Sequence, residues 1–271
     1  APSCAGRGPG SCTAMIHPLE ALQRWIGDRL SRYLSQRTRT RSSSARTDHT
    51  LLMACLRPGD VLLIEGRTRI SAPIKYLTQS IWSHAAIYVG DMPGRERAFI
   101  EVDLREGVRA VGVDAYAGLH CRICRPVGMT AVEIEALVSF VTQRIGYRYD
   151  LKNVFDLARY LLPFAPVPSH LRRRMIALGS GDPTRAICST LIAQAFESVR
   201  YPILPIIERV PSGDPLHPDC IEEILHVRSY TLYVPRDFDV SPYFAIVKPT
   251  LASGFDFRRL AWDDSLTLPG A

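Results

Sequence analysis

The sequence predicts an α+β fold in which a mostly antiparallel sheet packs against helices. Its 271 residues are 46% apolar, which is enough to bury a large core in one domain or in two small ones. Between residues 57 and 127, short apolar or alternating runs follow one another across short turns, a succession typical of a meander of antiparallel strands. Two longer runs, at 130–146 and 188–199, repeat apolar residues at helical spacing and supply helices.

The basic N-terminal arm, residues 1–46, differs from the domain at residues 47–271. The arm holds eight arginines and two acidic residues, so it carries the whole net charge of +6. Apolar residues at helical spacing in 19–34 predict an amphipathic helix with a basic polar face. We expect this helix to dock on the domain or a partner, or else to lie with residues up to 46 on an anionic membrane. Nucleic acid is not an expected partner, because no recognised motif or aromatic platform accompanies the charge.

The first half of the domain is expected to consist of strands with one short helix. The Pro58-Gly59 turn signal precedes the first apolar run. Strands are predicted within residues 57–66, 84–90, 97–103, 107–113 and 121–127, and a short helix at 71–79.

The second half of the domain mixes helices with long irregular segments. The helix at 130–146 has Thr130 as its N-cap and Glu133 three residues later. Further predictions are helices at 151–161 and 188–199, irregular segments at 163–187 and 201–220, and strands at 229–234 and 243–249. The segment 163–187 is interpreted either as a lid or as a plain surface excursion.

Seven cysteines form an odd set without regular spacing, which is unlike a disulfide framework, and at least one thiol is expected to be free. Cys121 and Cys124 form a CxxC pair, but the pair lies in a predicted strand, and no second pair follows at zinc-site spacing. Neither a metal nor an organic cofactor is therefore expected.

His84 and Cys188 occupy positions where their chemistry matters. His84 opens the apolar run 85–89, and a buried imidazole has either a structural hydrogen bond or a chemical role. Cys188 lies in the first turn of a predicted helix, where free N–H groups and the helix dipole favour a thiolate. Each residue taken alone is more often structural, since a cysteine on an apolar helix face is usually inert.

Glu101 is a candidate partner for His84, because it lies within the apolar run of the next predicted strand. If the two strands are neighbours, Glu101 can hold one ring nitrogen of His84 while the other faces Cys188. An oxyanion would find the Cys188 backbone N–H, with the Tyr149 hydroxyl as a second candidate donor.

Six stretches together resemble the circularly permuted NlpC-type cysteine hydrolases, the YiiX/YebB-like branch of the papain-fold superfamily. They are PGDVLLIEG, WSHAAIYVGD, FIEVDLREGV, GYRYD, CSTLIAQAF and PRDFDVSPYF, and they span about residues 55–247. In ordinary papain-fold enzymes the cysteine precedes the histidine, whereas here the histidine comes first, which is the order of the permuted branch. The resemblance implies a permuted papain-like fold, with Cys188 as nucleophile, His84 as general base and Glu101 as the residue orienting it. It leaves open whether Tyr149 or Tyr147 lies near the oxyanion.

The resemblance also implies a cysteine hydrolase that forms an acyl-enzyme. Related permuted branches include enzymes acting on lipid acyl groups, and the basic helix together with LRRRMIAL and YPILPII favours lipid acyl ester or amide bonds at a membrane surface. Ordinary NlpC-type enzymes cut peptides of bacterial cell-wall stems, which is the alternative. A non-catalytic binding module that has kept the pocket is a third hypothesis. Hydrolysis against acyl transfer and the oligomeric state stay open.

No membrane-spanning helix is expected, because the sequence holds no apolar run of the length needed to cross a bilayer. No apolar signal core is visible in residues 1–12, although a chain that begins without Met leaves the compartment open. Localisation therefore stays open, and the resemblance and the basic arm favour a bacterial protein that is peripheral at a membrane as one expectation.

Overall fold

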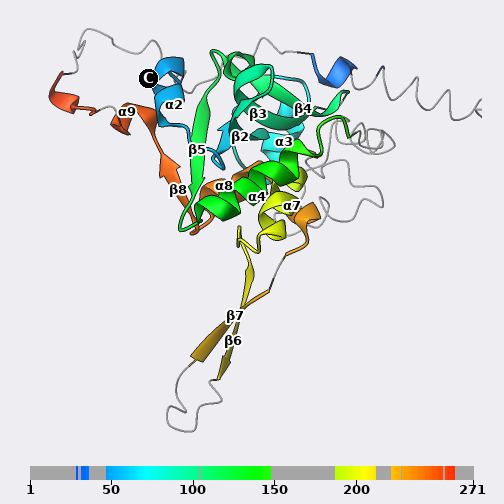
Figure 1. Cartoon of the computed structure of the whole chain (residues 1–271), viewed down its shortest axis with the longest axis vertical. Coiled ribbons are helices and arrows are strands. Elements are labelled where there is room, and N and C mark those ends of the chain that lie inside the picture. Colours follow the sequence, from blue (N-terminus) through cyan, green and yellow to red (C-terminus); the bar gives the residue numbers. More distant parts are fainter. Residues whose placement is uncertain are drawn as a thin grey trace, which may run out of the picture.

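A computed structural model gives the arrangement of the chain (Figure 1). It describes residues 29, 32–36, 47–103, 105–147, 187–211, 221–226, 228–252 and 254–259. The helix predicted at 151–161 and nearly all of the segment 163–187 lie outside the described residues, as does most of the arm.

A six-stranded antiparallel sheet forms the centre of the molecule, in the order β4-β3-β2-β1-β5-β8. The first four strands form a meander, and β5 then pairs with the free edge of β1 and with β8. The strands are β1 (Val61–Ile64), β2 (His84–Met92), β3 (Arg95–Asp103), β4 (Gly107–Gly112), β5 (Cys121–Pro126) and β8 (Phe244–Val247). The predicted α+β fold, a mostly antiparallel sheet packed against helices, is confirmed.

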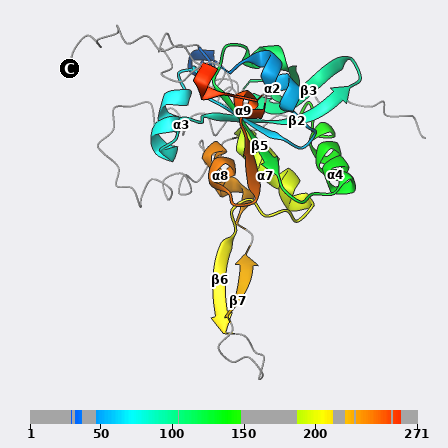
Figure 2. The same cartoon turned by 90° about the vertical axis from the view of Figure 1, so that its left-hand side faces the viewer.

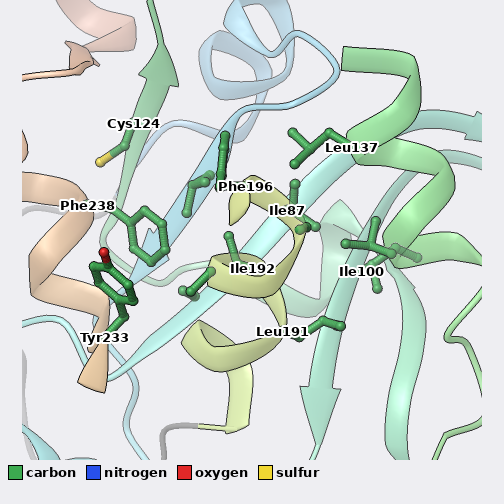
Figure 3. Close-up of a cluster of buried hydrophobic side chains, with 14 of the residues drawn as sticks. Ile87, Ile100, Cys124, Leu137, Leu191, Ile192, Phe196, Tyr233 and Phe238 are labelled. Carbon is green, nitrogen blue, oxygen red and sulfur yellow. The ribbon is translucent and has the colours of Figure 1, made fainter. Parts of the chain in front are cut away.

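The two faces of the sheet bury separate clusters, because side chains alternate along each strand. One face packs against α4 (Ala131–Thr142), α7 (Ile187–Ser198) and α8 (Pro235–Val240), and α7 crosses the centre of this cluster (Figure 3). The other face is covered by Leu52 of α2 (His49–Cys55). The larger cluster, on the α7 side, includes Leu63, Ile87, Ile100, Leu137, Leu191, Ile192, Phe196 and Phe238.

Several helices begin where the sequence predicts. The capping box at α4 is present: the Glu133 N–H donates to Thr130 Oγ1 at 3.3 Å, and the Thr130 N–H donates to the Glu133 carboxylate at 2.8 Å. This satisfies N–H groups that the first turn leaves without helical partners. The remaining helices are α3 (Ser71–Thr78) and α9 (Pro249–Ala252), with 3₁₀ turns η1 (Val113–Tyr116), η2 (Tyr230–Leu232) and η3 (Phe257–Arg259).

The end of the predicted helix at 19–34 docks on the domain. Residues 32–34 are helical, and Leu34 is completely buried. The Ile70 N–H donates to the Leu34 carbonyl at 3.2 Å, and the Arg69 guanidinium lies 4.2 Å from the centroid of the Tyr33 ring. The docked interpretation thus holds for these residues, and the rest of the helix lies outside the described part of the chain.

A second, two-stranded sheet stands away from the main body in both views (Figures 1 and 2). It consists of β6 (Ile206–Pro211) and β7 (Ile221–His226), paired antiparallel. The sequence predicted an irregular segment at 201–220, so the first of these strands is a correction. The prolines of this segment favoured the irregular prediction. Pro211 is nevertheless compatible with a strand, because it stands at the end of β6, where a missing backbone N–H is tolerated. Four of its aliphatic side chains are exposed: Ile206, Ile207, Ile224 and Leu225.

The strand predicted at 229–234 is wrong. Tyr230–Leu232 instead form the 3₁₀ turn η2, and the chain continues into α8 at Pro235. Alternation of apolar and polar residues favours a strand only where a neighbouring strand pairs with it. Here the buried Tyr233 packs against the cluster around α7.

Candidate active site

His84 is the first residue of β2 and lies opposite Ile64, the last residue of β1. The chain just before it is fixed by Trp82. The Trp82 ring is buried, stacks on His120 with ring centroids 5.2 Å apart, and donates its Nε1–H to Asp239 at 3.0 Å. His84 is therefore held at the end of the sheet, where its ring is reached from α7 as well as from β3.

Cys188 is the second residue of α7, which packs against β2 and β3. Its side chain is buried. Burial alone would raise the pKa of its thiol, but the charge and hydrogen bond of His84, followed by hydrogen bonds from the Ala85 and Ser189 backbone N–H groups, lower the pKa below its usual value. The first turn of a helix supplies N–H groups without helical partners, which explains the contact from Ser189.

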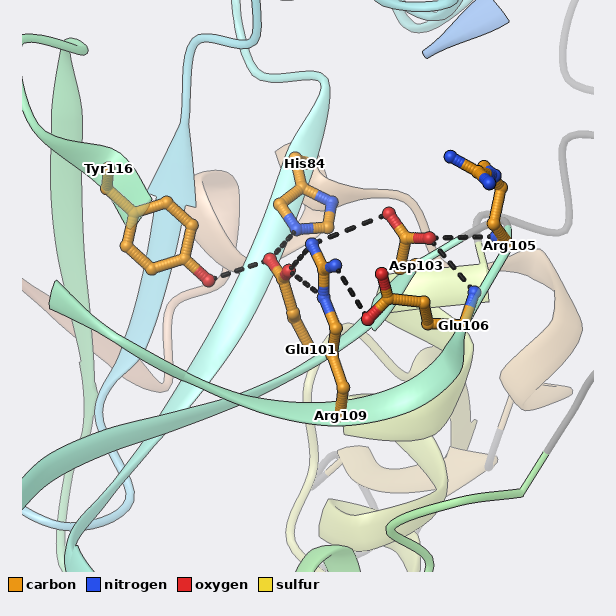
Figure 4. A network of polar contacts seen from close by, with 7 residues as sticks. All are labelled: His84, Glu101, Asp103, Arg105, Glu106, Arg109 and Tyr116. Carbon is orange, nitrogen blue, oxygen red and sulfur yellow. Dashed lines mark hydrogen bonds and ion pairs between the residues drawn. The ribbon is translucent and has the colours of Figure 1, made fainter. Parts of the chain in front are cut away.

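Glu101 of β3 holds the other side of the imidazole. His84 Nε2 lies 2.6 Å from Glu101 Oε2 (Figure 4). Burial tends to lower the pKa of His84, but the charge and hydrogen bond of Cys188 and then those of Glu101 raise it well above its usual value. With Nε2 engaged by Glu101, Nδ1 is the ring nitrogen left for Cys188. The geometry therefore favours an imidazolium between a thiolate and a carboxylate.

Four hydrogen-bond donors surround the Glu101 carboxylate (Figure 4). Arg109 donates from Nε and Nη2 to Oε1 at 2.9 and 2.6 Å, and the Tyr116 hydroxyl donates to Oε2 at 2.8 Å, beside His84. Burial would raise the pKa of Glu101, but His84, Arg109 and Tyr116 lower it to about 2. Glu101 therefore stays ionised throughout the neutral and mildly acidic range.

Arg109 and Tyr116 were not among the site residues predicted from the sequence. Arg109 lies directly opposite Glu101 in the β3–β4 pair, so both side chains point to the same face of the sheet. The short turn between Asp103 and Gly107 sets this register, and an arginine opposite a carboxylate across such a turn is the signal that would have found it. Tyr116 comes from η1 and carries no comparable signal, because its position depends on how the chain turns after β4.

Tyr149, predicted as a candidate oxyanion donor, lies outside the described residues. Its alternative, Tyr147, has a largely exposed side chain and accepts the Val108 N–H at its backbone carbonyl, at 2.9 Å. The structure thus brings together Cys188, His84 and Glu101.

The CxxC cysteines do not form a site. Cys121 belongs to the cluster on the α2 face of the sheet, and Cys124 belongs to the cluster on the α7 face. Their thiols therefore point in opposite directions, as expected for residues three apart on a strand. Within the described residues, no group of three or more His, Cys, Asp or Glu side chains is arranged to hold a metal ion.

None of the helices that the structure describes is both long enough and apolar enough to cross a membrane.

Comparisons with known proteins found one family model and a similar solved structure. Residues 55–160 match the model of a family described as permuted papain-like amidase enzymes, YaeF/YiiX, C92 family; the matched segment contains His84 and Glu101 and ends before Cys188. No curated protein matches the chain. A solved structure described as the metalloprotein YiiX from Escherichia coli O157:H7 is similar, at 13% identity and a TM-score of 0.42, covering 71% of this chain and 96% of that one. The family match confirms the predicted resemblance to permuted papain-like cysteine hydrolases over residues 55–160, with YiiX-type replacing NlpC-type.

Proposed function

We propose that the chain is a cysteine amidase or esterase in which Cys188 is the nucleophile, His84 the proton carrier and Glu101 the residue that orients His84. The Cys188 thiolate attacks an acyl carbonyl carbon and forms a C–S bond. His84 then gives its proton to the leaving amine or alcohol as the scissile bond breaks. In the second half, His84 takes a proton from water, whose oxygen displaces the Cys188 sulfur and releases the acid.

The observation that carries this proposal is the continuous contact from Cys188 through His84 to Glu101. A thiol is a strong nucleophile only as thiolate, and the pKa of Cys188 is lowered by His84 despite burial, which acts in the opposite direction. The Nε2–Oε2 contact of 2.6 Å fixes the imidazole ring for transfer at its other nitrogen. A non-catalytic module would not need a polarised cysteine of this kind.

For the substrate we propose lipid acyl amide or ester bonds, at an anionic membrane surface contacted through the arm at residues 19–46. The support for the arm is its basic charge, with eight arginines and two acidic residues in 1–46. The support for a lipid surface is the β6–β7 hairpin, where Ile206, Ile207, Ile224 and Leu225 expose aliphatic side chains away from the main body. The family description as amidases favours the amide among these bonds. Peptide bonds of cell-wall stems are the alternative outcome of the test.

The test is lipid turnover by wild type, Cys188→Ala and the matched control Cys124→Ala. Each protein is incubated with bacterial lipid extract in vesicles with and without added anionic lipid, and free fatty acids and lysolipids are followed by mass spectrometry. We expect release by wild type and Cys124→Ala, faster on anionic vesicles, and a fall of about 10⁴-fold in Cys188→Ala.

Three other outcomes contradict parts of the proposal. Equal release by Cys188→Ala overturns the nucleophile assignment. Cysteine-dependent cleavage of purified peptidoglycan, with none of the lipids, overturns the lipid substrate but keeps the mechanism. Equal rates on neutral and anionic vesicles overturn the membrane contact of the arm.

A further inference from the structure

We propose that Arg109 and Tyr116 are positioning residues that keep the Glu101 carboxylate ionised and aimed at His84, so that they set the acid limit of Cys188 reactivity. This inference rests on the proposed function and deepens it. Neither residue touches Cys188, and both act through Glu101.

The geometry of the sheet builds this arrangement. His84, Glu101 and Arg109 lie on β2, β3 and β4, three successive strands, and Arg109 is the direct cross-strand partner of Glu101. A carboxylate has about four lone-pair positions. The Nε–H and Nη2–H groups of Arg109 both donate to Oε1, while His84 and Tyr116 share Oε2. The carboxylate therefore has no freedom to rotate without breaking a charge-assisted hydrogen bond.

Arg109 and Tyr116 are themselves held in place. Arg109 Nη1 lies 3.1 Å from the Glu106 carboxylate and Nη2 lies 3.5 Å from that of Asp103. The Tyr116 ring is buried and meets Phe99 edge to face, with centroids 5.4 Å apart. Burial and the charge of Glu101 raise the pKa of Tyr116 well above its usual value, so the hydroxyl keeps its proton and remains a donor.

Asp60 shows that several donors do not by themselves keep a buried carboxyl acidic. It accepts from Arg125 Nε and Nη2 at 2.8 and 2.7 Å and from the Arg57 backbone N–H at 2.8 Å, yet burial raises its pKa above the usual value. One arginine and one backbone N–H therefore do not offset the burial of this carboxylate. Glu101 receives His84 and Tyr116 in addition to Arg109, and its pKa is lowered.

Charged and titratable groups face this unit from several of the described elements. Cys188 faces His84 from α7, Asp103, Glu106 and Arg109 lie on or between β3 and β4, Tyr116 lies in η1, and Cys121 of β5 acts on Tyr116. Without Arg109 or Tyr116, fewer hydrogen bonds oppose the effect of burial, so the pKa of Glu101 rises. A protonated Glu101 no longer stabilises the imidazolium, so Cys188 loses its thiolate at a higher pH than in the wild type.

The test is alkylation of Cys188 by iodoacetamide between pH 4 and 8, measured by peptide mass spectrometry. The variants are Tyr116→Phe, Arg109→Lys and Arg109→Gln, with Arg105→Gln as the matched control that removes a nearby charge without touching Glu101. We expect the acid limb of the rate profile to move upward, lowering the rate at pH 5 by about 10-fold in Arg109→Gln and about 3-fold in Tyr116→Phe. Arg109→Lys should be intermediate, because it keeps the charge but loses the paired hydrogen bonds from Nε and Nη2 to Glu101 Oε1.

The outcomes separate this inference from the proposed function. Wild-type Cys188 that reacts no faster than Cys121 and Cys124 refutes both. Fast wild-type alkylation with the acid limb unmoved in Tyr116→Phe and Arg109→Lys refutes the positioning role alone. An equal shift in Arg105→Gln also refutes it, because the effect would then follow net charge. Should Arg109→Gln fail to fold, Tyr116→Phe decides, since it removes one oxygen atom and keeps the ring packing.

Discussion

The buried cysteines of β5 and of α7 are similarly hidden from solvent but chemically opposite. Cys121, Cys124 and Cys188 are 6%, 0% and 7% exposed. Burial raises the pKa of Cys121 to about 12 and raises that of Cys124 as well, whereas His84 lowers the pKa of Cys188. Burial alone therefore does not determine whether a thiol is inert or reactive. The charged groups and hydrogen-bond donors that contact its sulfur atom determine this.

The position of each cysteine in its element explains what its sulfur meets. Cys124 lies within a strand that pairs on both sides, with Val61 of β1 and with Ile246 of β8, so the neighbouring backbone N–H groups are used by the sheet. Cys188 lies in the first turn of a helix, where N–H groups lack helical partners, and at the end of the sheet where His84 begins β2. The N–H groups at the start of α7 and the imidazole at the start of β2 together explain why the pKa of Cys188 is lowered while burial raises the pKa of the β5 cysteines.

The largest expected effect is that of His84→Ala, which should leave Cys188 with a raised thiol pKa and low reactivity, as in the cysteines of β5. Without the imidazolium, burial becomes the dominant influence and raises the pKa of the thiol. We expect alkylation of Cys188 at pH 7 to fall by about 10²-fold or more, with Cys121 and Cys124 unchanged, as measured by peptide mass spectrometry.

The matched control is His226→Ala, which removes an exposed histidine of the β6–β7 hairpin that is also paired with a glutamate, Glu208, at 2.6 Å. It should leave the alkylation of Cys188 unchanged. Full reactivity of Cys188 in His84→Ala would mean that the helix start alone distinguishes it from the β5 cysteines.

A smaller effect follows from Glu101, which keeps His84 charged. Its folded-state pKa of about 2 lies below the usual 4.5, so its contribution to the free energy of unfolding is fully present well above pH 4.5 and is lost as the pH falls towards 2. We expect the wild type to lose about 2 kcal/mol between pH 5 and pH 3 that Glu101→Gln does not lose, measured by denaturant unfolding. The imidazole of His84 is protonated in both the folded and unfolded states in this window, so it adds no slope. Parallel pH profiles for the two proteins would contradict the lowered pKa.

Sequence patterns predicted the parts of this site that depend on neighbouring segments. The central strands are short apolar or alternating runs joined by short turns, so β2 and β3 were expected to pair, and with them His84 and Glu101. The first turn of the helix at Cys188 was equally visible. The contact of Cys188 with His84 joins residues far apart in the chain, and the family resemblance, more than spacing, pointed to it.

Other features depended on interactions that local patterns do not contain. The exact opposition of Arg109 and Glu101 requires the register of β3 and β4, and a slip of one residue would turn Arg109 to the other face. The hairpin of β6 and β7 was hidden by prolines, which favour an irregular segment in any local interpretation. The prediction for residues 229–234 erred in the opposite sense: their alternation resembles a strand, but among the described residues no strand pairs with them.

The smallest expected effect is that of replacing Cys124, a β5 cysteine that we expect to take no part in the reaction. Cys124 is fully buried in the cluster that also contains Phe238 and Leu137, so Cys124→Ala removes a sulfur atom from a packed core. We expect it to lower the free energy of unfolding by about 1 kcal/mol and to leave the alkylation rate of Cys188 and the rate of lipid release unchanged. Cys188→Ala makes the same chemical change at a comparably buried site and should lower the rate of lipid release by about 10⁴-fold. A loss of either rate in Cys124→Ala, at a temperature where the variant is folded, would show that β5 carries part of the chemistry and that the two kinds of cysteine are not separate.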